Sequence, residues 1–373
     1  MTIKGLVGFR FYITWIISAI IILNSSTALC SDTSETKTAD HEQTKRKKFN
    51  AKEFLFGHIS DAHEWHIFTY RDKHVSIYLP VILLSRKAGI VIFSSAKFHH
   101  GHSTYHHKGY NYKLEHEGNN KGQIIEYASD GSSCKPFDIS ITKNIVALFF
   151  SVILITWIFL STAGLYKKNR GKPPKGLQSF IEPIIIFVRD DIARQSIGEK
   201  QYERFTPYLL TVFFFIWINN MLGIVPIPPG GANLTGNIAV TGVLAFFTMM
   251  VTNISGNRNY WKHIFNTPGV PVWLKIPPLM PIIEIFGVFT KPIVLMIRLF
   301  ANITAGHLIT LGFMSIIFVF GMRSPTIGLV ISPLSIVFIL FMIFLELLVA
   351  FIQAFVFTFL SALYIGMAVE EHH

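Results

Sequence analysis

The stretch Lys291-Pro-Ile-Val-Leu-Met-Ile-Arg-Leu-Phe-Ala-Asn-Ile-Thr-Ala-Gly-His307 carries one arginine, Arg298, within a long apolar region of the chain. Between residues 292 and 369 the only fully charged side chains are Arg298, Arg323 and Glu346. A guanidinium at the centre of a bilayer costs about 2.5–3.5 kcal/mol on insertion scales. Packing does not require that cost. The stretch therefore predicts a functional arginine that faces an ion path or a partner carboxylate.

The composition is that of a membrane protein. Of the 373 residues, 51% are hydrophobic, and the mean hydropathy is +0.45. Residues 205–257 contain no Asp, Glu, Lys or Arg. About 20 apolar residues in a helix cross a bilayer core, so this stretch can cross twice. The ten-residue alternating segments of a β-barrel are absent. Much of the net charge of +11 lies in loops, where positive charge sets topology, and no nucleic-acid partner is expected.

The apolar segments predict an all-α polytopic membrane protein with about five transmembrane helices. One amphipathic helix is expected along the membrane surface, and an α+β extension is expected at the exported N-terminus. The expected spans are residues 144–166, 206–225, 237–254, 281–320 and 328–368, and the surface helix is 177–204. The last two helices have about 40 residues each and are about 60 Å long. Because the hydrocarbon core is about 30 Å thick, they must tilt strongly or run partly along the membrane plane. Gly321 and Pro333 are expected to kink or end them.

The chain divides into three predicted regions. Residues 1–28 are interpreted as a signal peptide, because Lys4 and Arg10 precede an apolar run and small residues at 26–28 offer a cleavage site. A signal anchor that stays attached is the alternative. Residues 29–142 form the expected periplasmic extension, and residues 143–373 form the membrane domain. Cleavage would leave Cys30 and Cys134 in an oxidising compartment, where they can form a disulfide. A lipid anchor on Cys30 is a weaker hypothesis.

Positive charge sets the expected orientation. Residues 167–175 carry five positive charges and no acid, and residues 255–280 carry three positive charges on the same side of the predicted bundle. The facing turns, 226–236 and 321–328, carry only Arg323. Positive loops stay in the cytoplasm, so the C-terminus is expected inside and the N-terminal region outside. This orientation agrees with a cleaved signal and fits the inner membrane of a bacterial cell.

The N-terminal extension holds 11 of the 15 histidines, including those at 99–102 and 106–107. Imidazoles are common metal ligands, but no cysteine pair or acidic frame defines a site. A polar loop is the favoured interpretation, and neither a metal nor a cofactor is expected. Two short apolar runs, 75–84 and 88–95, are separated by Arg86 and Lys87 and predict a β-hairpin. Gly and Asn at 118–122 predict a turn.

Polar side chains fall on defined faces of the last two helices. Glu284 and Lys291 lie 14 and 7 positions before Arg298, so the three share a face to within about 40°. Asn302 neighbours Arg298 at i+4, and His307 points to the opposite side of the helix. On the last helix, Glu346 and Gln353 share a face. Glu346 is the expected partner of His307, and Gln353 is a candidate partner of Arg298.

Such a set is typical of a proton or ion relay. The alternative is that each polar group only satisfies the hydrogen bonds of another in the core of a helix bundle. Arginine keeps its charge at any working pH, so Arg298 cannot shuttle protons. It can keep a passing carboxylate ionised and block leakage between two half-pathways. Glu and His can bind and release protons when burial shifts them. The expected arrangement is a fixed charge between two relays, with the moving carboxylate on another protein.

The run Arg298-Leu-Phe-Ala-Asn-Ile-Thr-Ala-Gly-His-Leu308 resembles the signature of subunit a of the F-type ATP synthase. The resemblance covers residues 143–373, with a looser match at Gly57–Trp65. Glu284, Lys291, the segment from Asn219 to Pro226, Asn233, Asn237 and the run after Gln353 occur in register. Many bacterial members carry Glu where this chain has His307 and His where it has Glu346, so the pair is exchanged here. The extension is longer than in most members.

The resemblance implies a stator that abuts a rotating ring of c subunits, assembled with peripheral-stalk b subunits, the rest of the synthase and membrane lipid. Arg298 matches the arginine that faces the ring carboxylate. The proton-path residues implied on the periplasmic side are Asn302, His307, Glu346 and Gln353. Glu284 is implied on the cytoplasmic side, and Lys291, Asn233 and Asn237 support the path. The chain lacks a Walker-type phosphate loop, so nucleotide chemistry is expected on other subunits.

Three alternatives stay open from the sequence. A sodium-coupled version of the same subunit would have the same motifs, because the ring protein mostly sets the ion. A secondary transporter would usually show an internal repeat and broken helices, and no repeat is visible. A purely structural assembly subunit would not need Arg298.

Overall fold

A computed structural model describes residues 61–370 apart from 71–72, 99–102, 116–121, 129–131, 169–172, 226–229 and 266–278, together with residues 51, 55 and 57. The predicted signal segment, Cys30, the histidines at 99–102 and most of the predicted turn at 118–122 lie outside the described residues. Cys134 is disulfide-bonded.

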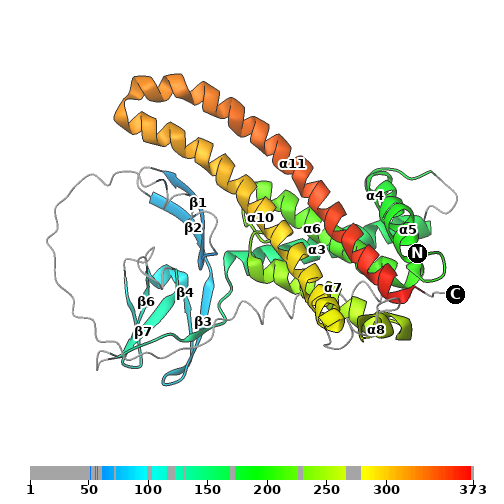
Figure 1. The fold of residues 1–373 in the computed structure, drawn as a ribbon. Coiled ribbons are helices and arrows are strands. Elements are labelled where there is room, and N and C mark those ends of the chain that lie inside the picture. Colours follow the sequence, from blue (N-terminus) through cyan, green and yellow to red (C-terminus); the bar gives the residue numbers. More distant parts are fainter. Residues whose placement is uncertain are drawn as a thin grey trace.

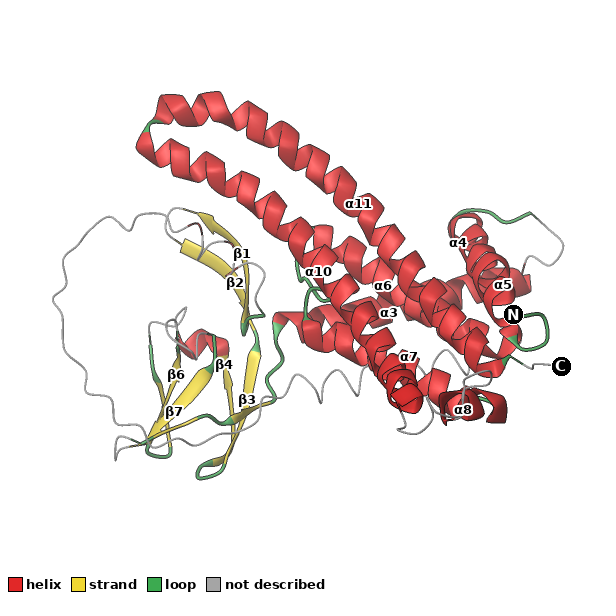
Figure 2. Ribbon diagram, viewed as in Figure 1, coloured by secondary structure: helices red, strands yellow, loops and turns green. Residues whose placement is uncertain are grey.

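The N-terminal part is built from short antiparallel strands (Figures 1 and 2). The strands are β1 (Glu64–Tyr70), β2 (Lys73–Tyr78), β3 (Pro80–Ser85), β4 (Gly89–Ser94), β5 (Tyr105–His107), β6 (Tyr110–Leu114), β7 (Ile124–Ala128), β8 (Ser133–Cys134) and β9 (Phe137–Asp138), with the 3-10 helix η1 (Ser95–Phe98) after β4. Among the described residues they form three sheets, ordered β1-β2, β4-β3-β9 and β5-β6-β7-β8. Alternate side chains such as Val81, Leu83, Val91 and Phe93 face inward around Tyr112, as the period-2 pattern of a strand requires.

The predicted hairpin is present as β3 and β4, which pair from Pro80↔Ser94 to Ser85↔Gly89. The boundary of its first strand was wrong. The run from 75 to 84 contains two strands, because β2 pairs with β1 in a separate sheet and the chain passes into β3 after Leu79. A continuous apolar run does not reveal such a change of partner.

The membrane part contains five helices that are long and apolar enough to cross a bilayer, among the residues described. The helices are α3 (Lys143–Lys168), α4 (Leu177–Ile186), the π-helix η2 (Phe187–Arg194), α5 (Gln195–Ile197), α6 (Tyr202–Ile224), α7 (Ile238–Ser255), α8 (Arg258–Phe265), α10 (Leu279–Arg323) and α11 (Pro325–Val369). The five predicted spans correspond to α3, α6, α7, α10 and α11. Figure 1 shows α4, α5 and α8 gathered at the end of the bundle that holds the C-terminus, while the strands lie at the other end.

Helix α6 lies at the core of the bundle. Its residues Phe213, Phe214 and Ile216 are fully buried. Helices α10 and α11 run antiparallel beside it and extend beyond it as a long pair (Figure 1). Each has 45 residues, which corresponds to about 68 Å. Their apolar surfaces are largely exposed within this chain, so lipid or a partner protein must cover them.

Two predicted boundaries were wrong. The expected turn at 321–328 is a single residue, Ser324, between α10 and α11. Pro325 occupies the first turn of α11, where proline is tolerated because its missing N–H needs no helical partner. Pro333 lies inside α11 without ending it. The expected surface helix 177–204 ends at Ile197, where Gly198 takes a φ of 90°, and residues from Tyr202 onward belong to α6.

Candidate functional site

His307 and Glu346 form a pair between α10 and α11. Nδ1 of His307 lies 3.4 Å from Oε2 of Glu346, and both side chains are largely buried, at 16% and 11% exposure. Thr310 donates a hydrogen bond to the other carboxylate oxygen of Glu346 at 2.9 Å. Each oxygen of the acid therefore has its own neighbour. The sequence suggested His307 as the partner of Glu346, but it gave no signal for Thr310.

Two glycines make room for this pair. A Cβ on Gly306 would lie 3.1 Å from Cγ and Oε1 of Glu346. A Cβ on Gly223 in α6 would lie 3.4 Å from Nε2 of His307 and 3.7 Å from the carbonyl oxygen of Ala232. His307 is therefore held between Glu346 of α11 and the end of α6. The two sides of its ring contact different helices.

Buried amide and hydroxyl groups extend from this point toward the start of α7. Thr235 donates to Oδ1 of Asn220 at 2.6 Å, and the amide of Asn220 donates to the carbonyl of Ala350 at 3.3 Å. Asn233 accepts a hydrogen bond from the backbone N–H of Gly236, and Asn237 caps α7 by accepting from Ala239. The amide nitrogen of Asn233 is buried with no hydrogen-bond partner among the described residues. These groups form a polar seam through an otherwise apolar bundle.

Arg298 has a different environment. It is exposed on the surface of α10, as are Lys291 and Asn302. In the described part of the chain Arg298 has no ion-pair partner, and no hydrogen bond joins it to Gln353, which is buried at 7% exposure. Nζ of Lys291, on the same helix, lies 5.4 Å from the centre of the Tyr364 ring of α11. The structure thus does not support the expected contact between Arg298 and Gln353.

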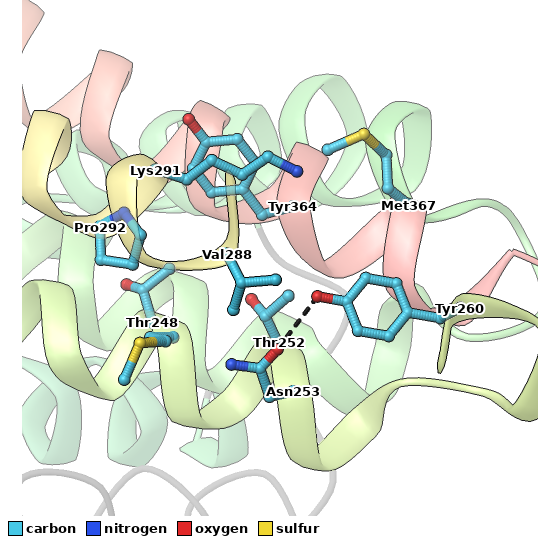
Figure 3. A pocket seen from close by; sticks show the side chains of 10 residues that line it. Thr248, Thr252, Asn253, Tyr260, Val288, Lys291, Pro292, Tyr364 and Met367 are labelled. Atoms are coloured by element: carbon cyan, nitrogen blue, oxygen red, sulfur yellow. Dashed lines mark hydrogen bonds between the residues drawn. The ribbon is translucent and has the colours of Figure 1, made fainter. Parts of the chain in front are cut away.

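A small cavity lies between the ends of α7, α10 and α11 and helix α8 (Figure 3). Lys291 and Tyr364 border it on one side, and Tyr260 and Asn253 border it on the other (Figure 3). The phenol of Tyr260 donates to Oδ1 of Asn253 at 3.0 Å. A water-sized sphere can occupy about 20 Å³ of the cavity, enough for about one water. The sequence did not indicate Tyr260, Asn253 or Tyr364.

Glu284 lies half-buried near this cavity, close to the start of α10. Burial raises the pKa of Tyr260, and the nearby charge of Glu284 raises it further. Glu284 is therefore on the side of the bundle that carries α8, away from the His307–Glu346 pair. Among the described residues no group of three or more His, Cys, Asp or Glu side chains can hold a metal ion.

The fold and the site define a class: a polytopic α-helical membrane protein that places ionisable side chains within its spanning helices. The family model for the ATP synthase A chain matches residues 145–366. The chain therefore belongs to the ATP synthase subunit a family. A second model, for a domain of unknown function (DUF8433), matches residues 54–142.

Curated relatives agree with this assignment. The chain is 42% identical over 244 residues to ATP synthase subunit a of Chloroherpeton thalassium, covering 63% of this chain and 69% of the relative. It is 41% identical over 257 residues to ATP synthase subunit a of Myxococcus xanthus, covering 68% of this chain and 79% of the relative. Membership places the chain in the membrane sector of the F-type ATP synthase, as a multi-pass channel component rather than a catalytic subunit.

Proposed function

We propose that this chain is the stator half-channel subunit that passes protons to and from the carboxylates of a rotating c-ring. The main support for the proposal is the environment of Arg298. This residue is exposed on a spanning helix and lacks an ion-pair partner within the described chain, although a lone charge at this depth is costly. A carboxylate on a neighbouring subunit would offset that cost. The apolar surface of α10 around it would then lie against the ring.

The proposed path has two halves. Protons from the outer side pass the polar seam and the His307–Glu346 pair and reach a ring carboxylate near Arg298. After nearly a full turn of the ring they leave through the region of Glu284, beside the cavity at Lys291. Each charge that crosses is worth about 2.3 kcal/mol per 100 mV of membrane potential. Arg298 cannot carry the proton itself, because its guanidinium does not deprotonate, so it separates the two halves.

The proposal also includes the orientation of the chain in the membrane and its partner subunits. The C-terminus and the cluster α4, α5 and α8 lie in the cytoplasm, and the strands lie in the periplasm of a bacterial cell. The positive charges of residues 167–175 favour this orientation. Peripheral-stalk b subunits complete the stator. Residues 1–28 are removed as a signal peptide.

The test compares two arginines on one helix. Arg298→Ala in the complete synthase, reconstituted in vesicles, should abolish ATP-driven proton pumping, because ring carboxylates lose the fixed charge that keeps them ionised. The matched control is Arg323→Ala at the outer end of α10, where the side chain is also exposed. That variant should pump like the wild type. Retained pumping by Arg298→Ala would overturn the proposal, and a requirement for sodium in the wild type would change the ion.

A further inference from the structure

A second cavity lies where the strands meet the membrane bundle. It is partly open and offers about 220 Å³ of space for water-sized spheres, more than about ten times what one water needs. Its polar lining comes from both parts of the chain: Asp61, His63, Gln123, Lys135, Asp138 and Asn237. Water is stable in a cavity only when polar partners are present, and this lining supplies carboxylate, imidazole, amide and ammonium groups. We call it the junction cavity.

His63 and Asp138 form a hydrogen-bonded pair at the junction cavity. Nε2 of His63 lies 2.7 Å from Oδ2 of Asp138, and their side chains are 10% and 22% exposed. Burial alone would raise the pKa of Asp138, but the hydrogen bond and charge of His63, together with hydrogen bonds from Ser140, outweigh it and hold the pKa below its usual value. The backbone N–H of Ser140 donates to the other oxygen of Asp138 at 2.9 Å. The N-terminal part of the chain that contains strands β1 to β9, called the strand domain below, thus holds an imidazole and an ionised acid beside a polar cavity.

Asp61 ties this cavity to the membrane bundle. Its Oδ1 accepts hydrogen bonds from the backbone N–H groups of Ala62 and Asn144, at 3.0 and 3.3 Å. Burial raises the pKa of Asp61, although Thr142, Lys143 and these N–H groups oppose the shift. The other charged side chains that line the cavity are Asp61 and Lys135, and Lys143 lies close enough to Asp61 for its charge to act on that carboxylate. The lining therefore contains both carboxylates and an ammonium group. A proton in the cavity is not repelled by a surface of purely positive charge.

The junction cavity adjoins the polar seam. Asn237 lines the cavity and caps α7. Trp65 of β1 packs with Ala147 and Ala232. The carbonyl of Ala232 faces Gly223, which lies against Nε2 of His307. Asn237 thus belongs both to the lining of the cavity and to the polar seam.

We propose that the strand domain forms the outer mouth of the proton path, with the His63–Asp138 pair exchanging protons in a hydrated junction cavity. The proposal rests on the proton-conducting function proposed above. His63 binds a proton from water on the outer side and releases one to water on the side of Asn237, and Asp138 stabilises the charged imidazole between the two steps. Imidazole suits this role because it changes charge between about pH 5 and 8. A metal site is the weaker assignment, since no group of three ligands occurs among the described residues.

The test measures passive proton flux through the complete synthase in vesicles, at a fixed membrane potential, while pH is varied on the strand-domain side. His63→Gln keeps a side chain that can donate to Asp138 but cannot titrate. We expect several-fold lower flux and loss of its pH dependence between about pH 5 and 8. The matched control is His106→Gln. His106 is exposed, hydrogen-bonds Asn111 and does not line the cavity, so flux should not change.

A second variant guards against a folding defect. Gln123→Trp places a large side chain at the cavity lining and should lower flux several-fold while leaving His63 and Asp138 themselves unchanged. Wild-type flux and pH profile in both His63→Gln and Gln123→Trp would overturn the proposal, as would an equal loss in His106→Gln. Arg298→Ala in the same vesicles separates the two proposals. If it still pumps, the proton-conducting function fails; if it does not pump while both cavity variants behave like wild type, only the outer mouth fails.

Discussion

At the scale of single residues, Gly306 controls how closely the carboxylate of Glu346 can approach α10. A Cβ at this position would lie 3.1 Å from two atoms of the acid, tighter than ordinary van der Waals contact. Gly306→Ala should therefore push Glu346 away from His307 and Thr310. Overpacking of this kind costs about 1–3 kcal/mol. We expect several-fold slower proton flux in vesicles, with near-normal amounts of assembled complex.

The control for Gly306 is another glycine of α10. A Cβ on Gly321 would meet nothing within 4 Å, so Gly321→Ala changes helix propensity equally without touching the pair. It should keep wild-type flux. Equal flux in the two variants would show that the carboxylate's position is not critical.

The sequence predicted part of this residue-scale arrangement. The pairing of His307 with Glu346 followed from two lone polar groups that each need a partner in an apolar setting. The roles of Thr310, Gly306 and Tyr364 could not be predicted, because they depend on the register of α10 against α11. One helix wheel describes one helix and contains no information about that register.

At the scale of elements, hydrophobic periodicity and length predicted the five spans. The predicted ends of the last two spans were wrong, because they relied on proline and glycine as helix breakers. Proline and glycine near 321–333 indicated a loop, whereas α10 and α11 are separated by Ser324 alone. Proline in the first turn of a helix costs little, and its effect inside a helix depends on which carbonyls it frees. Residues 187–194 form the π-helix η2. A search for the 3.6-residue periodicity of an α-helix does not distinguish this segment from an α-helix.

Helix α11 packs against α5 through Gly366. A Cβ at this position would overlap the backbone carbonyl oxygen of Ser196, and backbone cannot move aside as a flexible side chain can. Gly366→Ala should separate the two elements and destabilise the bundle by about 1–3 kcal/mol. The measurement is the thermal unfolding midpoint of the purified chain in detergent.

Gly164→Ala in α3 serves as the matched control for that experiment, because a Cβ there meets nothing within 4 Å. Alanine has the higher helix propensity, so its midpoint should be equal or higher. A wild-type midpoint for Gly366→Ala would contradict the close contact between α5 and α11.

At the scale of the whole molecule, the strand domain is fastened to the bundle by contacts between residues far apart in sequence. Asp61 accepts from the backbone of Asn144, 83 positions later, and the N–H of Lys143 donates to the carbonyl of Ala62 at 3.1 Å. The sequence predicted an extension and a bundle as separate regions. It could not predict their contact, because hydrophobic periodicity reports local structure and not which acid reaches which helix end.

The His63–Asp138 pair makes a pH-dependent contribution to this junction. Because the folded pKa of Asp138 lies below its ordinary value of 3.8, the contribution is present above that value and is lost as pH falls through the folded pKa. Asp138→Asn should lower the free energy of unfolding by about 1.5–3 kcal/mol near neutral pH, the range for hydrogen bonds to charged groups. Unfolding of the purified chain in detergent, followed near neutral pH and again well below the usual carboxyl range, tests this.

At acid pH the wild-type Asp138 is itself protonated, so the two proteins should converge. Glu199→Gln provides the control, since Glu199 pairs with Arg194 at the surface and is 76% exposed; such pairs contribute little, and its unfolding should match the wild type at both pH values. A deficit in Asp138→Asn that persists undiminished at acid pH would mean that the side chain acts by shape or packing. The ionised pair would then not be what fastens the strand domain above the bundle.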